Sequence, residues 1–370
     1  MFRAFGFLLL VPTIFSFAVE EIEFTKLFGL MAVIFIAVFS TIKYFLKKEE
    51  CRLKHAVISL ALAWTSIALA SAIPFLVHGI KFIDAFFEAF SGWTGTGFSM
   101  IQNPQNLPLS LNFWRGLIQW VGGFGIVVLV LLLYERPKTA FTLFLAEGRS
   151  ENFYTDLLKV ARMIVLVYAL FTLLGFCLML ISGVPLFDAF INTLTSIATG
   201  GFTTNEIGVG YFGIMPMCIT ILLMLIGGIS FASHYNLIKG KIKQFFKNPE
   251  IIFMFIIIVF AFAFVSLEIY LTKKGNYFDG LFYIVSALTG TGATTKFPVG
   301  AFPSVATLIL IFLMISGPTY GSTGGAIKLW RTLVLFKVIR RQILKVFLPC
   351  LLYTSPSPRD LSTSRMPSSA

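Results

Sequence analysis

Three stretches of the sequence repeat one pattern: an aspartate, a short apolar run, and a cluster of glycine and threonine. They extend from Asp84 to Gly97, from Asp188 to Gly201 and from Asp279 to Gly292, and in each the acid precedes the last glycine by thirteen residues. A hydroxyl residue recurs two positions later, at Ser99, Thr203 and Thr294. Agreement at three places indicates an internal repeat, which decides architecture before other signals do.

The chemistry available to such a repeat is cation coordination by backbone carbonyls. Glycine permits positive φ angles, so successive carbonyls can face one side, and rings of carbonyls replace the hydration shell of a permeating cation. An aspartate at the start is a good N-cap for a short helix, whose negative C-terminal end then faces the Gly/Thr cluster and favours a cation. A helix-packing face of small residues is the alternative, but it explains one cluster better than three in register.

Catalytic and metal-binding constellations are missing from the sequence. The four cysteines are scattered without a C-x-x-C pair, and the three histidines, His55, His78 and His234, form no ligand pair. There is no G-x-S-x-G or Walker A motif. We therefore predict no enzyme and no covalent cofactor, and we interpret His234, beside a basic loop at the end of an apolar run, as a packing or capping residue.

Composition identifies the elements that must position the repeats. Of the 370 residues, 57% are hydrophobic and only 12% are charged, and the mean hydropathy is +0.88, so the chain is predicted to be an all-α polytopic membrane protein. The apolar runs predict eight spans, at 4–18, 27–46, 55–77, 111–134, 159–182, 212–236, 251–272 and a glycine-interrupted one at 302–348. The repeats contain shorter helical segments, too short to cross a bilayer and typical of re-entrant loops, at 83–93, 187–198 and 278–288.

The net charge of +12 is concentrated in four clusters between the apolar runs. Such a bias marks cytoplasmic loops, so we predict that the clusters and the N-terminus face the cytoplasm and that the charge does not serve nucleic-acid binding. The clusters comprise Lys43, Lys47, Lys48, Arg52 and Lys54; Arg136, Lys138, Arg149, Lys159 and Arg162; Lys239, Lys241, Lys243 and Lys247; and Lys328, Arg331, Lys337, Arg340, Arg341 and Lys345.

Three further segments, each after one of the repeats, complete a recognisable pattern. They are residues 113–123 (Phe-Trp-Arg-Gly-Leu-Ile-Gln-Trp-Val-Gly-Gly), 225–234 (Leu-Ile-Gly-Gly-Ile-Ser-Phe-Ala-Ser-His) and 321–328 (Gly-Ser-Thr-Gly-Gly-Ala-Ile-Lys). With the repeats they resemble the potassium-transporting subunits of the Trk/Ktr/HKT superfamily, most closely the TrkH type, from about residue 50 to about 349. The resemblance implies helix–pore loop–helix units arranged around one pore like a potassium channel, with an extra N-terminal helix pair.

The same resemblance implies the functional residues, with the potassium ion as substrate and as the only metal, held at a filter. The filter residues would be Thr94, Gly95, Thr96 and Gly97; Ala198, Thr199, Gly200 and Gly201; and Thr289, Gly290, Thr291 and Gly292. A gate loop beneath the filter would comprise Gly321, Ser322, Thr323, Gly324, Gly325 and Lys328. Lys328 either places its charge near the inner vestibule or begins the cytoplasmic cluster.

The resemblance also implies assembly and location. It implies a homodimer in the plasma membrane of a prokaryote, with a cytoplasmic ring of TrkA-like nucleotide-binding regulatory subunits that docks on the basic inner loops.

The repeat spacing suggests a domain division and a missing unit. The predicted parts are an N-terminal helix pair (1–50), three helix–pore–helix units (51–138, 139–246 and 247–349) and a polar tail (350–370). The repeat acids lie 104 and then 91 residues apart, so a fourth pore segment would begin at or beyond the end of this sequence. We therefore expect a truncated or chimeric chain with a disordered, non-native tail. Two alternatives stay open: a sodium-linked or poorly selective cation transporter, and an inactive three-unit membrane fragment.

Overall fold

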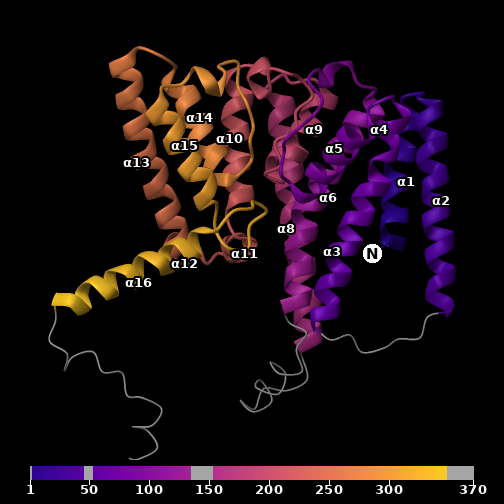
Figure 1. Cartoon of the computed structure of the whole chain (residues 1–370), viewed down its shortest axis with the longest axis horizontal. Helices are drawn as coiled ribbons and strands as arrows, with labels where there is room; N and C mark the ends of the chain where they lie inside the picture. Colours follow the sequence, from indigo (N-terminus) through magenta and orange to yellow (C-terminus); the bar gives the residue numbers. More distant parts are fainter. Residues whose placement is uncertain (1, 46–52, 135–152, 348–370) are drawn as a thin grey trace, which may run out of the picture.

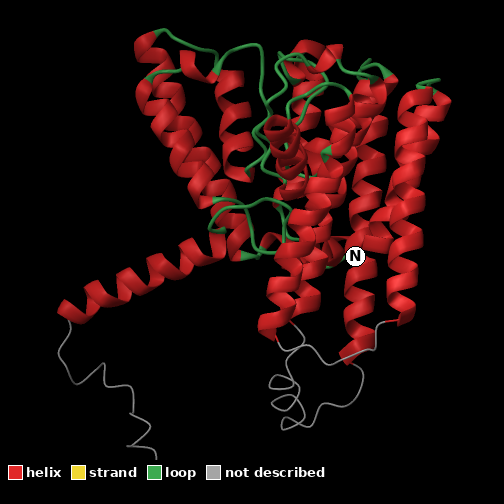
Figure 2. Cartoon of the chain, turned by 45° about the vertical axis from the view of Figure 1, so that its right-hand side comes forward, coloured by secondary structure: helices red, strands yellow, loops and turns green. Residues whose placement is uncertain are grey.

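The computed structural model describes residues 2–45, 53–134 and 153–347, and every regular element in these ranges is helical. The predicted tail at 350–370 and most of the first and second basic clusters lie outside the described residues. Long helices run side by side, with short helices and loops filling one half of the bundle (Figures 1 and 2). The predicted all-helical membrane fold is confirmed.

After an N-terminal pair, three sets follow, each with a long helix, a short helix that carries the repeat, and a further apolar helix. The pair is α1 (Phe2–Ala18) and α2 (Ile22–Phe45). The first set comprises α3 (Leu53–Ser71), α4 (Ile73–Val77), α5 (Phe82–Thr94) and α6 (Leu109–Tyr134). The second comprises α8 (Phe153–Ile181), α9 (Leu186–Ile197), α10 (Ile214–Gly228) and α11 (Phe231–Ile238). After α12 (Ile242–Phe246), the third comprises α13 (Pro249–Thr272), α14 (Tyr277–Thr289), α15 (Ser304–Ser316) and α16 (Leu329–Phe347). Short 3-10 turns at Pro104–Asn106, Val209–Phe212 and Val299–Ala301 precede α6, α10 and α15.

The N-terminal pair is fixed to the first set by aromatic packing. The Phe5 ring of α1 lies 6.0 Å from the ring of Trp93 on α5 and 6.2 Å from that of Trp114 on α6, measured between centroids. Both indole N–H groups donate to Ser71 at the end of α3, one to its hydroxyl and one to its carbonyl. These contacts join α1, α3 and α6 to the short helix α5.

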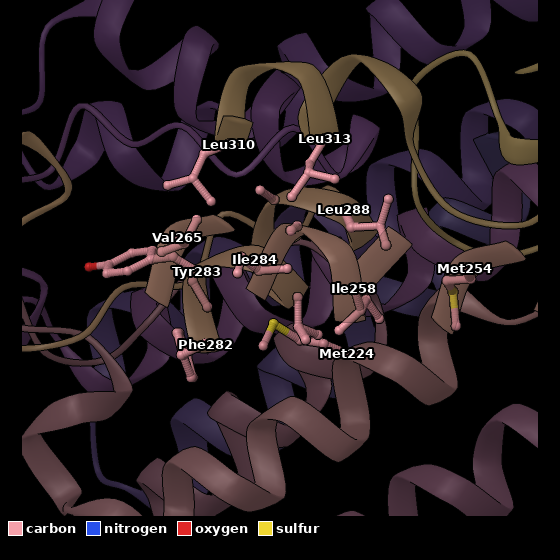
Figure 3. Close-up of a cluster of buried hydrophobic side chains, with 14 of the residues drawn as sticks. Met224, Met254, Ile258, Val265, Phe282, Tyr283, Ile284, Leu288, Leu310 and Leu313 are labelled. Atoms are coloured by element: carbon pink, nitrogen blue, oxygen red, sulfur yellow. The ribbon is translucent and has the colours of Figure 1, made fainter. Parts of the chain in front are cut away.

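The third set is held by a separate apolar cluster (Figure 3). Met224 of α10, Val265 of α13, Phe282 and Ile284 of α14, and Leu310 of α15 are all buried there. Inside a bilayer such packing stabilises through van der Waals contact more than through transfer from water. It fixes α14 between α10, α13 and α15.

Glycine pairs set how closely the long helices approach the short ones. A Cβ at Gly122 of α6 would overlap the carbonyl oxygen of Trp93, the last turn of α5. A Cβ at Gly227 of α10 would likewise overlap the carbonyl oxygen of Ile197, the last residue of α9. The second glycine of each pair, Gly123 or Gly228, packs on the next set instead, against Ala198 or Thr289. The two pairs therefore occupy equivalent positions, and each joins its own short helix to the next one in the chain.

The short helices match the predicted segments, but their N-caps do not. We predicted Asp84, Asp188 and Asp279 as N-caps, whereas the helices begin two residues earlier and place each aspartate in the first turn. The caps are Lys81, Pro185 and Asn276, of which only Asn276 accepts a side-chain hydrogen bond, from the N–H of Phe278. The acids still lie near the positive helix end, as their charge favours.

Three of the predicted spans are not continuous helices, and the one at 55–77 is divided between α3 and α4. The span at 212–236 is broken between α10 and α11, which meet at 103°. The span at 302–348 ends as a helix at Ser316, and α16 runs sideways from the bundle (Figure 1). By length and composition, three described helices are able to cross a membrane, Ile22–Ile42, Arg162–Ile181 and Pro249–Thr272, or up to four if the bent pair counts as one span. Eight were predicted; α1 has only 17 residues, and the apolar runs at 212–236 and 302–348 are divided.

Candidate ion-conducting site

The three Gly/Thr loops, residues 94–97, 198–201 and 289–292, leave the ends of α5, α9 and α14 in the same way. Each short helix is followed by a residue in the left-handed conformation: Gly95 (φ 67°), Thr199 (φ 51°) and Gly290 (φ 72°). The next N–H then bonds back to a helix carbonyl, from Thr96 to Ser91, from Gly200 to Thr195 and from Thr291 to Ser286. This is the geometry of a Schellman C-cap. It directs each loop from a negative helix end in a repeated conformation.

The loops interlock through their last glycines. A Cβ at Gly97 would overlap the carbonyl oxygen of Gly200, and a Cβ at Gly201 would overlap that of Thr291. Both glycines also have positive φ angles, of 81° and 83°, which side chains rarely adopt. The first loop thus lies directly against the second, and the second against the third. No other residue type fits at positions 97 and 201 without moving the neighbouring loop.

The arrangement has a free side. Apart from its chain neighbours, no heavy atom of the described residues lies within 4 Å of a Cβ built at Gly292, which is the equivalent of Gly97 and Gly201. Gly95 is likewise open, and Thr94 and Thr96 of the first loop are exposed. Ala198, Thr199 and Gly200 of the second loop are buried. Within the described part of the chain, the second loop therefore has neighbours on both sides, whereas the first and third each have one.

Behind the first and third loops, the fourth residue after the repeat acid holds the returning chain. Glu88 accepts the N–H of Met100 at 2.9 Å, and the hydroxyl of Tyr283 accepts the N–H of Thr295 at 3.1 Å. Both N–H groups belong to the third residue after the last glycine. The corresponding residue of α9 is Asn192, which is 1% exposed and has no hydrogen-bond partner among the described residues.

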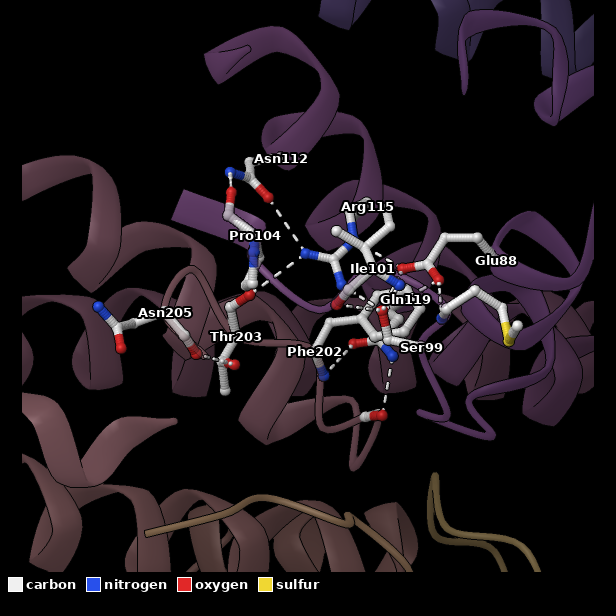
Figure 4. A network of polar contacts seen from close by, with 12 residues as sticks. Glu88, Ser99, Ile101, Pro104, Asn112, Arg115, Gln119, Phe202, Thr203 and Asn205 are labelled. Atoms are coloured by element: carbon white, nitrogen blue, oxygen red, sulfur yellow. Dashed lines mark hydrogen bonds and ion pairs between the residues drawn. The ribbon is translucent and has the colours of Figure 1, made fainter. Parts of the chain in front are cut away.

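A buried ion pair connects the first loop with the second (Figure 4). Arg115 Nε lies 2.8 Å from Glu88 Oε1, and the two side chains are 3% and 0% exposed. The guanidinium also donates to Ser99 Oγ, to Asn112 Oδ1 and to the carbonyl of Thr203. The central guanidinium carbon, Cζ, lies 4.4 Å from the centroid of the Phe202 ring, so the cation also contacts an aromatic face. The four hydrogen bonds of the Arg115 guanidinium thus go to groups that flank the two loops.

The sequence interpretation missed both members of this pair. Arg115 was quoted within the segment 113–123, and Glu88 within the first repeat, without a role for either. The available signal was a single acid and a single base, each inside an apolar run, since unpaired charges at such positions are costly.

The predicted gate loop lies against the ends of the second and third short helices. The hydroxyl of Thr323 lies within donating distance of the carbonyls of Gly227 (3.0 Å) and Ile197 (3.3 Å) and 3.0 Å from the hydroxyl of Thr199. A Cβ at Gly324 would overlap the carbonyl oxygen of Thr289. The loop therefore touches two of the three Gly/Thr loops, at Thr199 and at Thr289.

The break between α10 and α11 supplies part of this attachment. Gly228 is the last residue of α10, and its carbonyl accepts both the N–H and the hydroxyl of Thr319. His234 Nε2 donates to the carbonyl of Ile226 at 2.8 Å, which favours capping among the predicted packing and capping roles. Carbonyls freed by the bend are thus bonded by the loop and by His234, as a buried helix end requires.

Lys328 folds back on the same loop. Its Nζ donates to Ser322 Oγ at 3.1 Å and to the carbonyls of Ser322 and Gly324. The carbonyl of Gly321, in the same loop, accepts the N–H of Phe231 at the start of α11. Of the two interpretations left open, the hydrogen bonds favour a charge held beside the loop over one that begins the cytoplasmic cluster. No cluster of three or more His, Cys, Asp or Glu residues that suits a metal ion occurs among the described residues.

Comparison with known proteins gives the family. The family model TrkH, described as cation transport protein, matches residues 28–355. The chain belongs to the TrkH family. The match begins inside α2 and ends at residue 355, so it is wider than the predicted range of about 50 to 349.

Relatives and a solved structure agree with the TrkH assignment. An uncharacterized cation transporter of Methanocaldococcus jannaschii is 34% identical over 93% of this chain and 71% of its own length. The Trk system potassium uptake protein TrkH of Salmonella typhimurium is 29% identical over 83% of this chain and 67% of its own. The crystal structure of the potassium transporter TrkH from Vibrio parahaemolyticus matches with a TM-score of 0.80 and 25% identity, and it covers 94% of this chain and 74% of that one.

We expect loss of one member of the ion pair to destabilise the protein strongly. Glu88→Gln would leave the buried guanidinium of Arg115 without its counter-charge, at a cost of roughly 3–5 kcal/mol in the free energy of unfolding. The double change Glu88→Gln with Arg115→Met would recover part of that cost because no uncompensated charge remains. Denaturant unfolding of the purified protein in detergent, followed by tryptophan fluorescence, measures both.

Glu206→Gln is the matched control, since Glu206 is exposed and its carboxylate has no hydrogen-bond partner among the described residues. Its effect should stay within about 0.5 kcal/mol. A Glu88→Gln variant no less stable than Glu206→Gln would show that the pair does not hold the loops.

Proposed function

We propose that this protein carries potassium ions across the membrane through a pore whose selectivity filter is formed by the three Gly/Thr loops. The observation that carries the proposal is the interlock of Gly97 with the Gly200 carbonyl and of Gly201 with the Thr291 carbonyl. It supports a ring of backbone carbonyls around one axis, which is how a filter replaces the hydration shell of potassium. The potassium uptake named for the TrkH relatives supports the choice of ion.

The proposed transport step involves no covalent chemistry. A potassium ion exchanges water for carbonyl oxygens of the loops, and the negative ends of α5, α9 and α14 favour the positive charge at that place. Rigid loops are needed because a carbonyl cage that contracts freely would also fit the smaller sodium ion. The buried clamps at Glu88, Tyr283 and Arg115 provide that rigidity.

A fourth pore unit is proposed for the free side of the filter. Gly292 has an open Cβ direction where Gly97 and Gly201 each meet a neighbouring carbonyl, and Thr94 and Thr96 are exposed on the other flank. One further loop of the same geometry would meet both flanks. The alternative of an inactive three-unit fragment applies if nothing fills that side, and a poorly selective cation transporter is the alternative if the filter is loosely closed.

The loop at 317–328 is proposed as the gate. It lies between α15 and α16 and is attached to the second and third Gly/Thr loops through Thr323 and Gly324. Movement of this loop would open or close the inner side of the filter. The proposed filter and gate residues are those named from the sequence.

Assembly and orientation are proposed as well. Lys239, Lys241, Lys243 and Lys247 lie on the segment from the end of α11 to α12, and the positive-inside bias supports a cytoplasmic position for this side and for the N-terminus. A homodimer, with TrkA-like regulatory subunits docked on this basic side, agrees with the Trk system named for the relatives.

The need for a fourth unit is tested by rescue of a potassium-uptake-deficient bacterial strain at micromolar to millimolar potassium. We expect rescue by the chain continued with the fourth helix–pore loop–helix unit of a TrkH relative, and no rescue by a matched continuation that lacks the pore loop. Rescue by the chain without any addition would refute the requirement for a fourth unit. Failure of the completed chain to rescue, despite normal membrane expression, would contradict potassium transport.

The filter itself is tested by Gly97→Ser in the completed chain. A side chain at this position meets the Gly200 carbonyl and a φ of 81°, so the cage should deform and the preference for potassium over sodium should fall by roughly 10-fold or more, a change of about 1.4 kcal/mol. Gly79→Ser is the control, because Gly79 has a φ of 95° but open space around its Cβ direction. Sodium inhibition of rubidium uptake measures the preference. An unchanged preference in Gly97→Ser means that these loops are not the filter.

The gate is tested by Thr323→Val in the completed chain, which keeps the side-chain volume and removes the hydroxyl bonds to the Gly227 and Ile197 carbonyls. The single hydroxyl hydrogen is shared between the two carbonyls, and its loss is worth about 1 kcal/mol, so basal uptake should rise several-fold without loss of selectivity. Thr307→Val is the control, since the Thr307 hydroxyl donates only to the carbonyl of Pro303, the N-cap of the same helix. Uptake equal to that of the control would argue against a gate held by Thr323.

A further inference from the structure

Gln119 connects the second helix of the first set with the Gly/Thr loop of the second. It lies on α6 and is 0% exposed. Its Nε2 donates to the carbonyl of Gly200 at 2.8 Å, and its Oε1 accepts the N–H of Phe202 at 3.1 Å (Figure 4). A primary amide offers one donor and one acceptor side by side, as a peptide group does. Gln119 therefore pairs with the second loop much as a neighbouring backbone would.

The carbonyl that Gln119 holds is the one that lies against Gly97. A carbonyl oxygen has two lone pairs, so it can accept the amide N–H and still face a cation. The amide fixes the rotation of the Gly200 peptide, because turning that carbonyl away would break a buried hydrogen bond. The contact is also tight, since a Cβ at Gly200 would lie 2.6 Å from Gln119 Oε1. Glycine at 200 and glutamine at 119 thus fit each other.

The second set has no such clamp on the third loop. The glycine pairs Gly122–Gly123 and Gly227–Gly228 are equivalent in their contacts, and three residues before each pair stand Gln119 and Met224. Met224 is buried in the apolar cluster of the third set and offers no N–H to the Thr291 carbonyl. Among the described residues, the carbonyl at this level of the filter is held by a side chain only in the second loop.

We propose that Gln119 is a positioning residue that sets ion selectivity by locking the Gly200 carbonyl at the junction of the first and second loops. This inference rests on the proposed function, because it assigns a role within that filter. A purely structural role for Gln119 would cost stability alone when the residue is changed. A positioning role changes the discrimination between potassium and sodium in protein that remains folded.

Two substitutions separate the contacts. Gln119→Met installs the residue found at the equivalent place in α10 and removes both hydrogen bonds. Gln119→Glu keeps the volume and the acceptor for the Phe202 N–H, but has no N–H for the Gly200 carbonyl. Met224→Leu is the control, a buried change of similar size at the equivalent position without a polar contact to a loop. Each is made in the chain as it stands and in the chain completed with a fourth unit.

Thermal unfolding of the purified proteins in potassium chloride and in sodium chloride reports ion discrimination without transport. The sodium concentration divided by the potassium concentration that gives equal stabilisation should fall roughly 5- to 10-fold in both Gln119 variants, the factor that one buried hydrogen bond corresponds to. Met224→Leu should leave the ratio unchanged. The selectivity of rubidium uptake in the completed chain should fall in parallel.

A Gln119→Met protein that keeps the full potassium-to-sodium ratio overturns the inference, and so does an equal loss in Met224→Leu. If Gln119→Met does not fold, Gln119→Glu decides by the same measurement, since it retains one of the two bonds. If neither form of the unsubstituted chain distinguishes potassium from sodium, the proposed filter fails and the role of Gln119 fails with it. Unsubstituted protein that discriminates, together with Gln119 variants that discriminate equally, refutes the role of Gln119 alone.

Discussion

The structure depends on one close approach: the last glycine of a Gly/Thr loop lies against a carbonyl of the next loop. Gly97 meets the Gly200 carbonyl, and Gly201 meets that of Thr291. Loops can come this near only if their helices do, and the glycine pairs at 122–123 and 227–228 bring each long helix against one short helix of its own set and one of the next. The repeated C-cap gives each loop the same backbone hydrogen bond where it leaves its short helix. Packing, capping and glycine placement thus serve a single geometric requirement.

The repeat is not symmetric in the side chains that hold it. At the same position of the short helix, the first set has the carboxylate of Glu88, the third has the hydroxyl of Tyr283, and the second has Asn192, which has no partner among the described residues. The second loop is instead held from outside its own set, by Arg115 at Thr203 and by Gln119 at Gly200. The loop with neighbours on both sides is therefore the one whose position is set by them. The pattern of residues within one repeat cannot show that a loop is held by side chains of another set.

The sequence predicted most of the helices, which depend on local patterns, but few of the bends and ion pairs, which depend on contacts between distant segments. The spacing from Asp84 to Gly97 and its two repeats located the short helices to within one or two residues, since apolar length and glycine clusters are local signals. The bend after Gly228 was missed because the segment 212–236 is apolar over most of its length, and the bend is stabilised by Thr319 and Thr323, some 90 residues away. The Glu88–Arg115 pair was missed for the same reason, since 27 residues separate its members. The sideways course of α16 depends on the attachment of the preceding loop, which no periodicity encodes.

Thr199 shows why the second loop matters beyond its position in the middle. At this place the other two loops have glycine, and a β-branched residue with a φ of 51° is strained by an amount of the order of 1–3 kcal/mol. The strain is retained where the threonine hydroxyl lies 3.0 Å from that of Thr323, whose own bonds reach the end of α9 and the break in α10. Glycine would relieve the strain and remove that contact. The backbone conformation of the second loop is thus tied to the loop at 317–328, so neither can move far without changing the energy of the other.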